Sequence, residues 1–299
     1  MSPAASPADA GIRSGVAFGL LAYTMWGMFP VYFVWTSSAA PLEVLAHRVL
    51  WAVPFGALIV SLRGQWRDVA DALTDRAKLV RLALAAASIS VNWLTYIWAI
   101  QQERIFETSL GYYINPLMYV AIGVLAFGER LRRLQGAAVA LATVGVAFLT
   151  FSGGTFPWVA MVLGSSFTLY GVIRKQVAIG AMPGLFIETL MLFPLAALWM
   201  SWYVAQGGAS ITSGDGWLAA LLILGGPVTV LPLMFFAIAA RRLTLTAIGF
   251  LQFLAPTLPF LTGVYYGEPL TTAKLACFAF IWTAVAVFSY DVLRRGRRA

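Results

Sequence analysis

Long apolar stretches alternate with short charged breaks along the whole chain. Crossing the hydrocarbon core of a bilayer, about 30 Å thick, takes a helix of roughly 20 mostly apolar residues. The pattern predicts such helices near residues 12–35, 42–62, 77–101, 107–127, 134–151, 158–172, 183–203, 217–240, 247–270 and 272–293. We therefore expect an all-α membrane protein with ten transmembrane helices.

The fourth and ninth stretches resemble each other. Residues 109–131 read SLGYYINPLMYVAIGVLAFGERL, and residues 247–270 read AIGFLQFLAPTLPFLTGVYYGEPL. Each carries a proline inside the apolar run, Pro116 or Pro256, and each ends in a Gly-Glu pair, with corresponding positions 139 to 140 residues apart. A long-period internal similarity of this kind indicates a duplicated unit.

Each copy of the unit contains five helices, which is an odd number. The second copy must therefore enter the membrane from the opposite side, which makes the two copies inverted repeats. The expected organisation is a disordered tail at 1–11, repeats at 12–151 and 155–293, and a basic tail at 294–299.

Basic residues favour one side of this arrangement. Of the 20 Lys and Arg residues, 17 fall in segments on the same side as the N-terminus, Arg104 and Lys274 fall on the other side, and Arg48 lies inside a span. Positively charged loops stay in the cytoplasm, so both termini are predicted to be cytoplasmic.

The composition agrees with a membrane protein. Only 11% of the residues are charged and 61% are hydrophobic, whereas soluble domains carry about 25% charged residues. The net charge of +8 is spread over the loops without forming a patch, so we do not expect nucleic-acid binding. The single cysteine, Cys277, lies in an apolar run, which predicts a small buried residue and no disulfide.

The longest charged break follows the second helix. Within it, Trp66, Val69 and Leu73 recur at helical spacing, and Arg and Asp residues occupy the other faces. This pattern predicts a short helix that lies in the plane of the lipid headgroups.

His47 and Arg48 form the only adjacent ionisable pair inside an apolar span. A charged residue there costs at least about 2.5 to 3.5 kcal/mol, so Arg48 must face protein, water or a ligand. A functional role is favoured for Arg48, whereas His47 could equally be a hydrogen-bonded structural residue. Glu188 lies 140 residues after Arg48, but the two are expected at different depths and not in contact.

Other polar residues also fall inside the spans. Asn92 and Tyr96 are four residues apart and share a helix face, which should point into the bundle. Pro116 and Pro256 each free a backbone carbonyl, although they could serve only to kink their helices. Trp26 could line a cavity or simply pack against other aromatic rings. Glu129 and Glu268 precede the fifth and tenth helices, whose N-termini would account for them.

Enzyme motifs are missing from the sequence. A zinc-protease helix needs two histidines and the chain has one; a P-loop and a Gly-x-Ser-Gly serine are also absent. We therefore expect no enzyme and no cofactor or metal. The inverted repeats with interrupted helices fit a secondary transporter, with a channel or lipid-handling protein as the alternative.

Several stretches together resemble the RarD family of EamA-type permeases, within the drug/metabolite transporter superfamily. They are WGMFPVYF (26–33), EVLAHRVLW (43–51), NWLTYIWA (92–99), ETSLGYYINPL (107–117), LYGVIRK (169–175), GLFIETL (184–190), GPVTVLPLMFFAIAARRL (226–243) and LQFLAPTLPF (251–260). The resemblance implies the EamA fold and a permease in the bacterial inner membrane. The family is associated with chloramphenicol sensitivity, and superfamily relatives export small metabolites, so it also implies an exporter.

Counting residues from the ends of the spans places the centre of the predicted substrate pathway near the midplane between the repeats, with Arg48 and Glu188 each marking one end of it. It comprises Tyr23, Trp26, His47, Arg48, Asn92, Trp93, Tyr96, Tyr112, Asn115, Pro116, Ser166, Tyr170, Glu188, Gln252 and Pro256. The expected partners are the lipid bilayer and a small-molecule substrate, such as an amino acid, a drug or another metabolite, with a homodimer as a further option.

Overall fold

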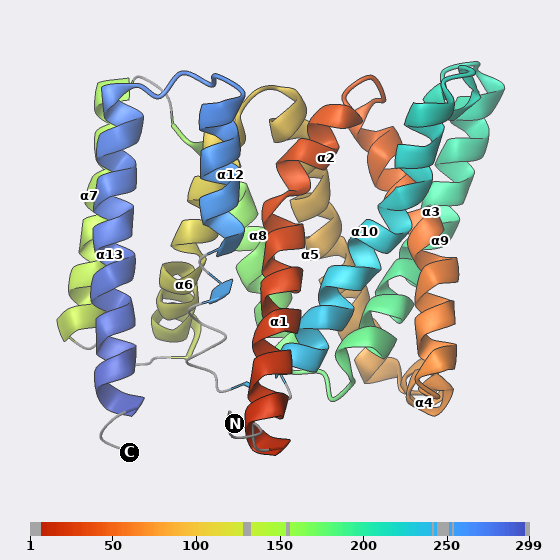
Figure 1. Cartoon of the computed structure of the whole chain (residues 1–299), viewed down its shortest axis with the longest axis horizontal. Helices are drawn as coiled ribbons and strands as arrows, with labels where there is room; N and C mark the ends of the chain where they lie inside the picture. Colours follow the sequence, from red (N-terminus) through yellow and green to blue (C-terminus); the bar gives the residue numbers. More distant parts are fainter. Residues whose placement is uncertain are drawn as a thin grey trace, which may run out of the picture.

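The structure, a computed structural model, describes residues 7–127, 133–153, 156–240, 242–243, 251–252 and 254–296. The regular elements within these ranges are helices (Figure 1). They are α1 (Pro7–Gly27), α2 (Phe29–Trp35), α3 (Pro41–Leu62), α4 (Trp66–Thr74), α5 (Arg76–Gln101), α6 (Ile105–Phe127), α7 (Arg133–Gly153), α8 (Trp158–Lys175), α9 (Ala181–Ala205), α10 (Gly216–Ala240), α12 (Leu254–Tyr265) and α13 (Thr272–Gly296), with a short 3-10 helix, η1 (Ser210–Thr212).

The helices form a bundle of transmembrane length. Within the described ranges, seven spans are long and apolar enough to cross a membrane: 13–35, 41–62, 76–101, 133–152, 181–205, 216–239 and 272–290. Helices α6, α8 and α12 run beside them in the same bundle (Figure 1). The all-α membrane fold predicted from hydropathy is therefore confirmed.

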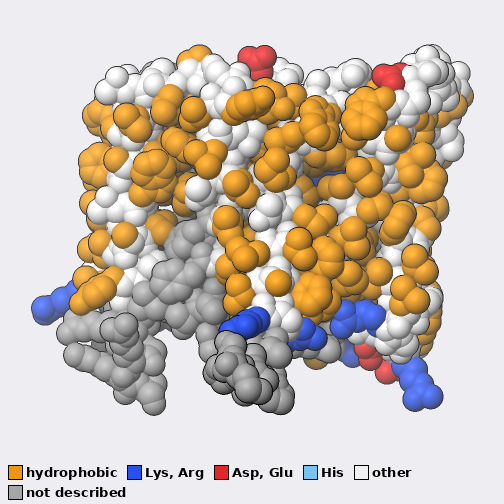
Figure 2. Space-filling model, in the orientation of Figure 1, with side chains coloured by type: hydrophobic (Ala, Val, Ile, Leu, Met, Phe, Trp, Pro, Cys, Tyr) orange, Lys and Arg blue, Asp and Glu red, His pale blue; other side chains and the backbone are white. Residues whose placement is uncertain are grey.

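Charge is distributed unevenly between the two ends of the bundle. In Figure 2, apolar side chains form a broad band across the molecule, and Lys and Arg side chains gather along the lower edge. The described chain begins and ends at this lower end, where α1 starts and α13 stops (Figure 1).

The first predicted span differs from the prediction in two ways. It is interrupted between Gly27 and Phe29, where α1 gives way to α2, and Pro30 lies in the first turn of α2. Proline lacks the N–H that would continue the hydrogen-bond ladder of α1, which accounts for the break. In addition, α1 already begins at Pro7, so the predicted disordered tail at 1–11 is helical from that residue onward.

The short helix predicted for the longest charged break is present as α4, at the lower edge of the bundle (Figure 1). Its buried residues are Val69 and Ala72, whereas Trp66 and Leu73 are exposed. Helix α4 ends just before Asp75, which caps the N-terminus of α5. The carboxylate of Asp75 accepts hydrogen bonds from the backbone N–H groups of Lys78 and Ala77, at 3.1 and 3.0 Å. These hydrogen bonds, led by that from Lys78, lower the pKa of Asp75.

The helices assigned to the two predicted repeats pack against one another. The first helix of each repeat packs against the third helix of the other, so that α1 contacts α10 and α8 contacts α5. The matching helices of the two repeats also pair, α3 with α9, α6 with α12 and α7 with α13. Because α3 also packs along α10, residues near the middle of α3 lie at a junction of both repeats.

Candidate functional site

Arg48 lies at this junction, on α3, and only 2% of its surface is exposed. Its guanidinium carbon is 4.6 Å from the ring centroid of Trp93 on α5, 5.3 Å from that of Phe33 and 5.6 Å from that of Phe29, both on α2. Cation–π attraction offsets part of the cost of burying this charge. Phe29 and Phe33 were not predicted as site residues, although the WGMFPVYF stretch contains both.

A hydroxyl from the second repeat completes these contacts. The Nε of Arg48 donates a hydrogen bond to Oγ1 of Thr229 on α10, at 3.1 Å, and the same hydroxyl donates to the carbonyl of Gly225, at 2.8 Å. Among the described residues, Nη1 and Nη2 of Arg48 have no hydrogen-bond partner, and no carboxylate forms an ion pair with the guanidinium. The nearest acid on α3, Glu43, instead accepts from N and Oγ of Ser210, at 2.6 and 2.8 Å.

Two glycines let α10 approach α3 closely enough for Thr229 to reach Arg48. A Cβ at Gly226 would overlap the backbone carbonyl of Trp51 and come within 2.8 Å of Trp51 Cβ. A Cβ at Gly225 would lie 3.1 Å from Cγ of Arg48. The absence of side chains at these positions therefore permits the close approach of α10 to α3 at the Arg48 site.

The predicted polar residues of α5, α6 and α8 meet around Asn92. The amide nitrogen of Asn92 donates to the carbonyl of Leu163, at 2.9 Å, and to Oγ of Ser166, at 3.1 Å. Its amide oxygen accepts from the hydroxyl of Tyr112, at 3.1 Å. Asn92 is 1% exposed and both ends of its amide are engaged, so in this conformation it joins three helices.

Aromatic rings connect the Asn92 network to Arg48. The rings of Phe33 and Tyr96 lie 5.9 Å apart, and those of Tyr96 and Tyr112 lie 5.6 Å apart. The structure thus gathers six of the predicted residues into one continuous group. We call this group the Arg48 cluster: Arg48, Asn92, Trp93, Tyr96, Tyr112 and Ser166, together with Phe29, Phe33 and Thr229.

Two further candidates tie α6 to its neighbours. With the amide nitrogen facing its acceptors, Asn115 donates to the carbonyls of Gly111 and Gly164, at 3.3 and 3.2 Å. The carbonyl of Pro256 on α12 accepts from Oγ of Ser109 on α6, at 2.8 Å. The side chain of Pro116 lies outside the described residues.

Glu188 belongs to a separate group near the lower end of the bundle. Its Oε1 is 3.4 Å from Nε of Arg174, and its Oε2 accepts from the hydroxyl of Tyr170, at 3.2 Å. Glu188 is 1% exposed, and its ion pair accounts for its burial. It forms no ion pair with Arg48, as predicted, but the pairing with Arg174 was not foreseen.

The remaining candidates do not form hydrogen bonds with the Arg48 cluster. The rings of Tyr23, Trp26 and Phe236 of α10 pack together in edge-to-face and tilted arrangements, with centroids 5.4 to 6.0 Å apart, which supports the packing interpretation of Trp26. Both ring nitrogens of His47 are buried without a partner in the described part of the chain. Gln252 is exposed.

The expectation for Glu268 needs correction. It interacts with a helix N-terminus, but with that of α6: its Oε2 accepts from the backbone N–H of Phe106, at 2.8 Å, and its Oε1 lies 3.0 Å from Nζ of Lys274. Burial of this loop carboxyl raises its pKa. The contact therefore joins the two repeats at the upper end of the bundle. Glu129 lies outside the described residues.

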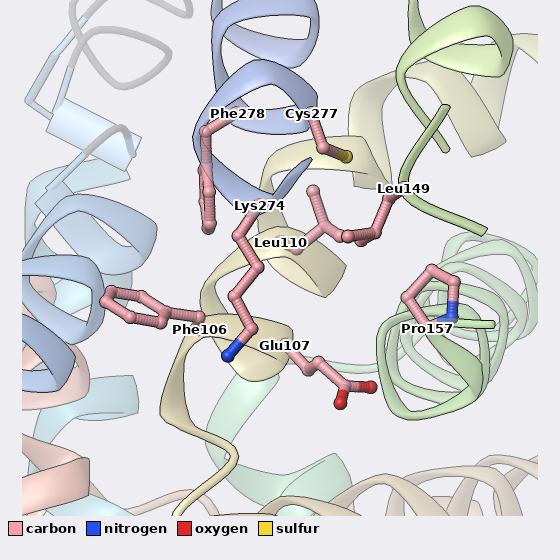
Figure 3. A pocket seen from close by; sticks show the side chains of 8 residues that line it. All are labelled: Phe106, Glu107, Leu110, Leu149, Pro157, Lys274, Cys277 and Phe278. Carbon is pink, nitrogen blue, oxygen red and sulfur yellow. The ribbon is translucent and has the colours of Figure 1, made fainter. Parts of the chain in front are cut away.

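A small pocket adjoins this contact, and none of its lining residues was predicted to belong to a functional site. Figure 3 shows Lys274 and Glu107 extending toward the same end of the pocket, with Cys277 and Leu149 at the other end. The complete lining is Phe106, Glu107, Leu110, Leu149, Pro157, Lys274, Cys277 and Phe278. Glu107 is paired with Arg104, at 2.6 Å, so its charge is already neutralised.

Comparison with known proteins gives consistent results. Residues 13–151 match the model of the EamA-like transporter family. The chain is 43% identical to an uncharacterized transporter of Pseudomonas aeruginosa, covering 97% of this chain and 98% of that one. It is 39% identical to protein RarD of Escherichia coli, covering 96% and 97%, and 31% identical to the chloramphenicol-sensitive protein RarD of Pseudomonas aeruginosa, covering 95% and 96%.

The fold also has a counterpart among solved structures. A protein crystal structure matches with a TM-score of 0.57 over 92% of this chain and 97% of the other, at 17% sequence identity. At this identity the likeness concerns the fold alone.

Proposed function

Because the chain belongs to the RarD family of EamA-like transporters, we propose that it is a secondary carrier which exports a small metabolite or drug-like molecule across the bacterial inner membrane. The Arg48 cluster would be its central substrate site. Outward transport follows from the resemblance to superfamily relatives that export small metabolites.

The observation that carries this proposal is the buried charge of Arg48. Its side chain is 2% exposed and has no acidic partner among the described residues. Arginine stays protonated in proteins, and an unpaired charge in the membrane interior is costly. A substrate group that pairs with Arg48 would offset this cost.

The position of the cluster also suits a carrier. Its residues come from α2, α3, α5, α6 and α8 and from Thr229 of α10, so both repeats contribute. In inverted-repeat transporters, the substrate lies near the midplane at the repeat interface, and movement of one repeat against the other changes access to it. A substrate held by Arg48 would therefore be exposed to each side in turn.

The test is counterflow in proteoliposomes that contain the purified protein. A binding screen against amino acids, drugs and other metabolites would first provide a solute. We expect unlabelled solute inside the vesicles to accelerate the uptake of labelled solute, because a carrier returns faster when it is loaded. Uptake without trans-stimulation would point to a channel, and exchange of lipid would point to a lipid-handling protein.

The orientation is also a proposal, and it yields a topology prediction. Reporter fusions placed after Ser38, Gly153 and Gly208 should report the periplasm, because the basic residues gather at the opposite end of the bundle (Figure 2). A fusion after Thr74, at the end of α4, should report the cytoplasm and serves as the control. A cytoplasmic signal from any of the first three would contradict the ten-span arrangement.

A further inference from the structure

Resting on the proposed function, we propose that the substrate is a monocarboxylate with a flat apolar body, and that a free ammonium group on the substrate opposes binding. The carboxylate would bind the terminal nitrogens of Arg48. The apolar body would lie among the aromatic rings of the Arg48 cluster.

The free edge of the guanidinium defines the anion-binding end. The Nε of Arg48 already donates a hydrogen bond to Thr229, whereas Nη1 and Nη2 have no hydrogen-bond partner in the described part of the chain. These two nitrogens form one edge of the planar guanidinium, and a carboxylate can accept two parallel hydrogen bonds from such an edge. The same edge would hold an alcohol or an amide less strongly, because neither brings a full negative charge.

The aromatic surroundings define the body of the substrate. Phe29, Phe33 and Trp93 surround the guanidinium, with ring centroids 4.6 to 5.6 Å from its central carbon. Tyr96 continues this aromatic surface, 5.9 Å from Phe33. Rings pack well against other flat apolar groups, in offset or edge-to-face arrangements. A carboxylate attached to an aromatic or similarly flat body matches both features.

The buried acids argue against a substrate ammonium group. Glu43 is bound to Ser210, Glu188 to Arg174, and Glu268 to Lys274. Among the described residues, then, none of these three buried carboxylates forms a hydrogen bond or ion pair with the Arg48 cluster, and Asn92 has both ends of its amide engaged. A zwitterion would bury its positive charge beside Arg48 without a partner, which is unfavourable.

The single positive charge argues for a single negative one. Arg48 is the only Lys or Arg that lies against Phe29, Phe33 or Trp93 in the described part of the chain. A dicarboxylate or a phosphate dianion would leave one charge uncompensated in the same apolar surroundings. These observations select a monoanion.

Four matched probes test the proposal on the purified full-length protein. They are 3-phenylpropanoate, which has a carboxylate alone; phenylalanine, which adds an ammonium; phenethylamine, which has the ammonium alone; and 3-phenylpropan-1-ol, which is neutral. Quenching of tryptophan fluorescence, to which Trp93 should contribute, and the rise in Tm report binding. We expect 3-phenylpropanoate to bind about tenfold or more tightly than the other three, a difference of about 1.4 kcal/mol.

Two variants show whether Arg48 is responsible. Arg48→Gln should abolish the preference for 3-phenylpropanoate. Arg104→Gln is the matched control, because Arg104 also lies against two rings, Trp98 and Trp158, but is already paired with Glu107. It should bind the carboxylate as the unmodified protein does. Loss of the preference in both variants, or in neither, overturns the assignment to Arg48.

The remaining outcomes separate this inference from the proposed function. Benzoate and indole-3-acetate extend the test to two other flat carboxylates. If phenylalanine binds as tightly as 3-phenylpropanoate or more tightly, or if none of the three carboxylates binds, the monocarboxylate class is overturned. Counterflow of another solute would then still support a carrier. Conversely, Arg48-dependent binding of 3-phenylpropanoate without counterflow would support the carboxylate site and contradict the carrier.

Discussion

Gly226→Ala is expected to lower both the thermal stability of the protein and the rate of counterflow. The new Cβ would meet the backbone carbonyl of Trp51, which cannot rotate away as a side chain can. Overpacking of this kind costs about 1 to 3 kcal/mol. If α10 moves away from α3 to relieve the clash, Thr229 also loses its hydrogen bond to Arg48. Tm in detergent and counterflow in proteoliposomes measure the two effects.

Two other glycines of α10 provide the controls for Gly226→Ala. A Cβ at Gly216 would meet nothing within 4 Å, so Gly216→Ala should leave Tm and counterflow unchanged. A Cβ at Gly225 would meet side-chain and backbone atoms of Arg48 at 3.1 to 3.3 Å, so Gly225→Ala should have an intermediate effect. Equal Tm values for the Gly216 and Gly226 variants would show that α3 and α10 are not closely packed here.

The fold was predictable because the bilayer restricts what the chain can do. A backbone in hydrocarbon must satisfy its own hydrogen bonds, so every long apolar run becomes a helix of membrane length. The third predicted span, 77–101, differs from α5 by one residue at its start. The prediction failed at the Gly27–Phe29 break, because hydropathy does not register a proline that interrupts the helix while the apolar run continues.

The candidate site was only partly predictable, because composition shows which residues are costly to bury but not what they meet. The burial cost showed that Arg48 must face protein, water or a ligand, but not which residues surround it. The hydroxyl of Thr229 comes from 181 residues away, and no local pattern predicts such a contact. The Asn92 network likewise joins residues 71 and 74 positions apart.

Glu188 shows how a helix boundary can alter the interpretation of a site. Its helix was predicted to follow a sixth span ending at residue 172, and Glu188 was expected to mark one end of the pathway because it lies at a different depth from Arg48. In the structure, α8 continues to Lys175, and its last turn carries Arg174 to the carboxylate. Gly184, one turn before Glu188, makes room for the guanidinium, because a Cβ there would overlap it. The negative charge of Glu188 is thereby paired with Arg174, which belongs to the same predicted repeat.

Arg48→Lys is expected to reduce counterflow of a carboxylate substrate by about 10- to 100-fold while the protein still folds and reaches the membrane. Lysine keeps the positive charge but lacks both the nitrogen that binds Thr229 and the planar edge that could bind a carboxylate twice. Hydrogen bonds to charged groups contribute about 1.5 to 3 kcal/mol, and losing one accounts for the expected factor. Counterflow rates normalised to the amount of folded protein provide the measurement.

Substitutions at Arg48 and Thr229 distinguish a substrate-binding role for Arg48 from a purely structural one. Arg48→Gln should reduce counterflow further than Arg48→Lys, because it removes the charge as well. Thr229→Val removes the hydroxyl that accepts from Nε and should lower the rate, whereas Thr229→Ser keeps that hydroxyl and should preserve most of it. An unchanged counterflow rate in Arg48→Lys would show that any buried cation at this position supports transport. A loss of folded protein in both Arg48 variants, with normal counterflow in Thr229→Val, would assign Arg48 to folding and contradict its role in substrate binding.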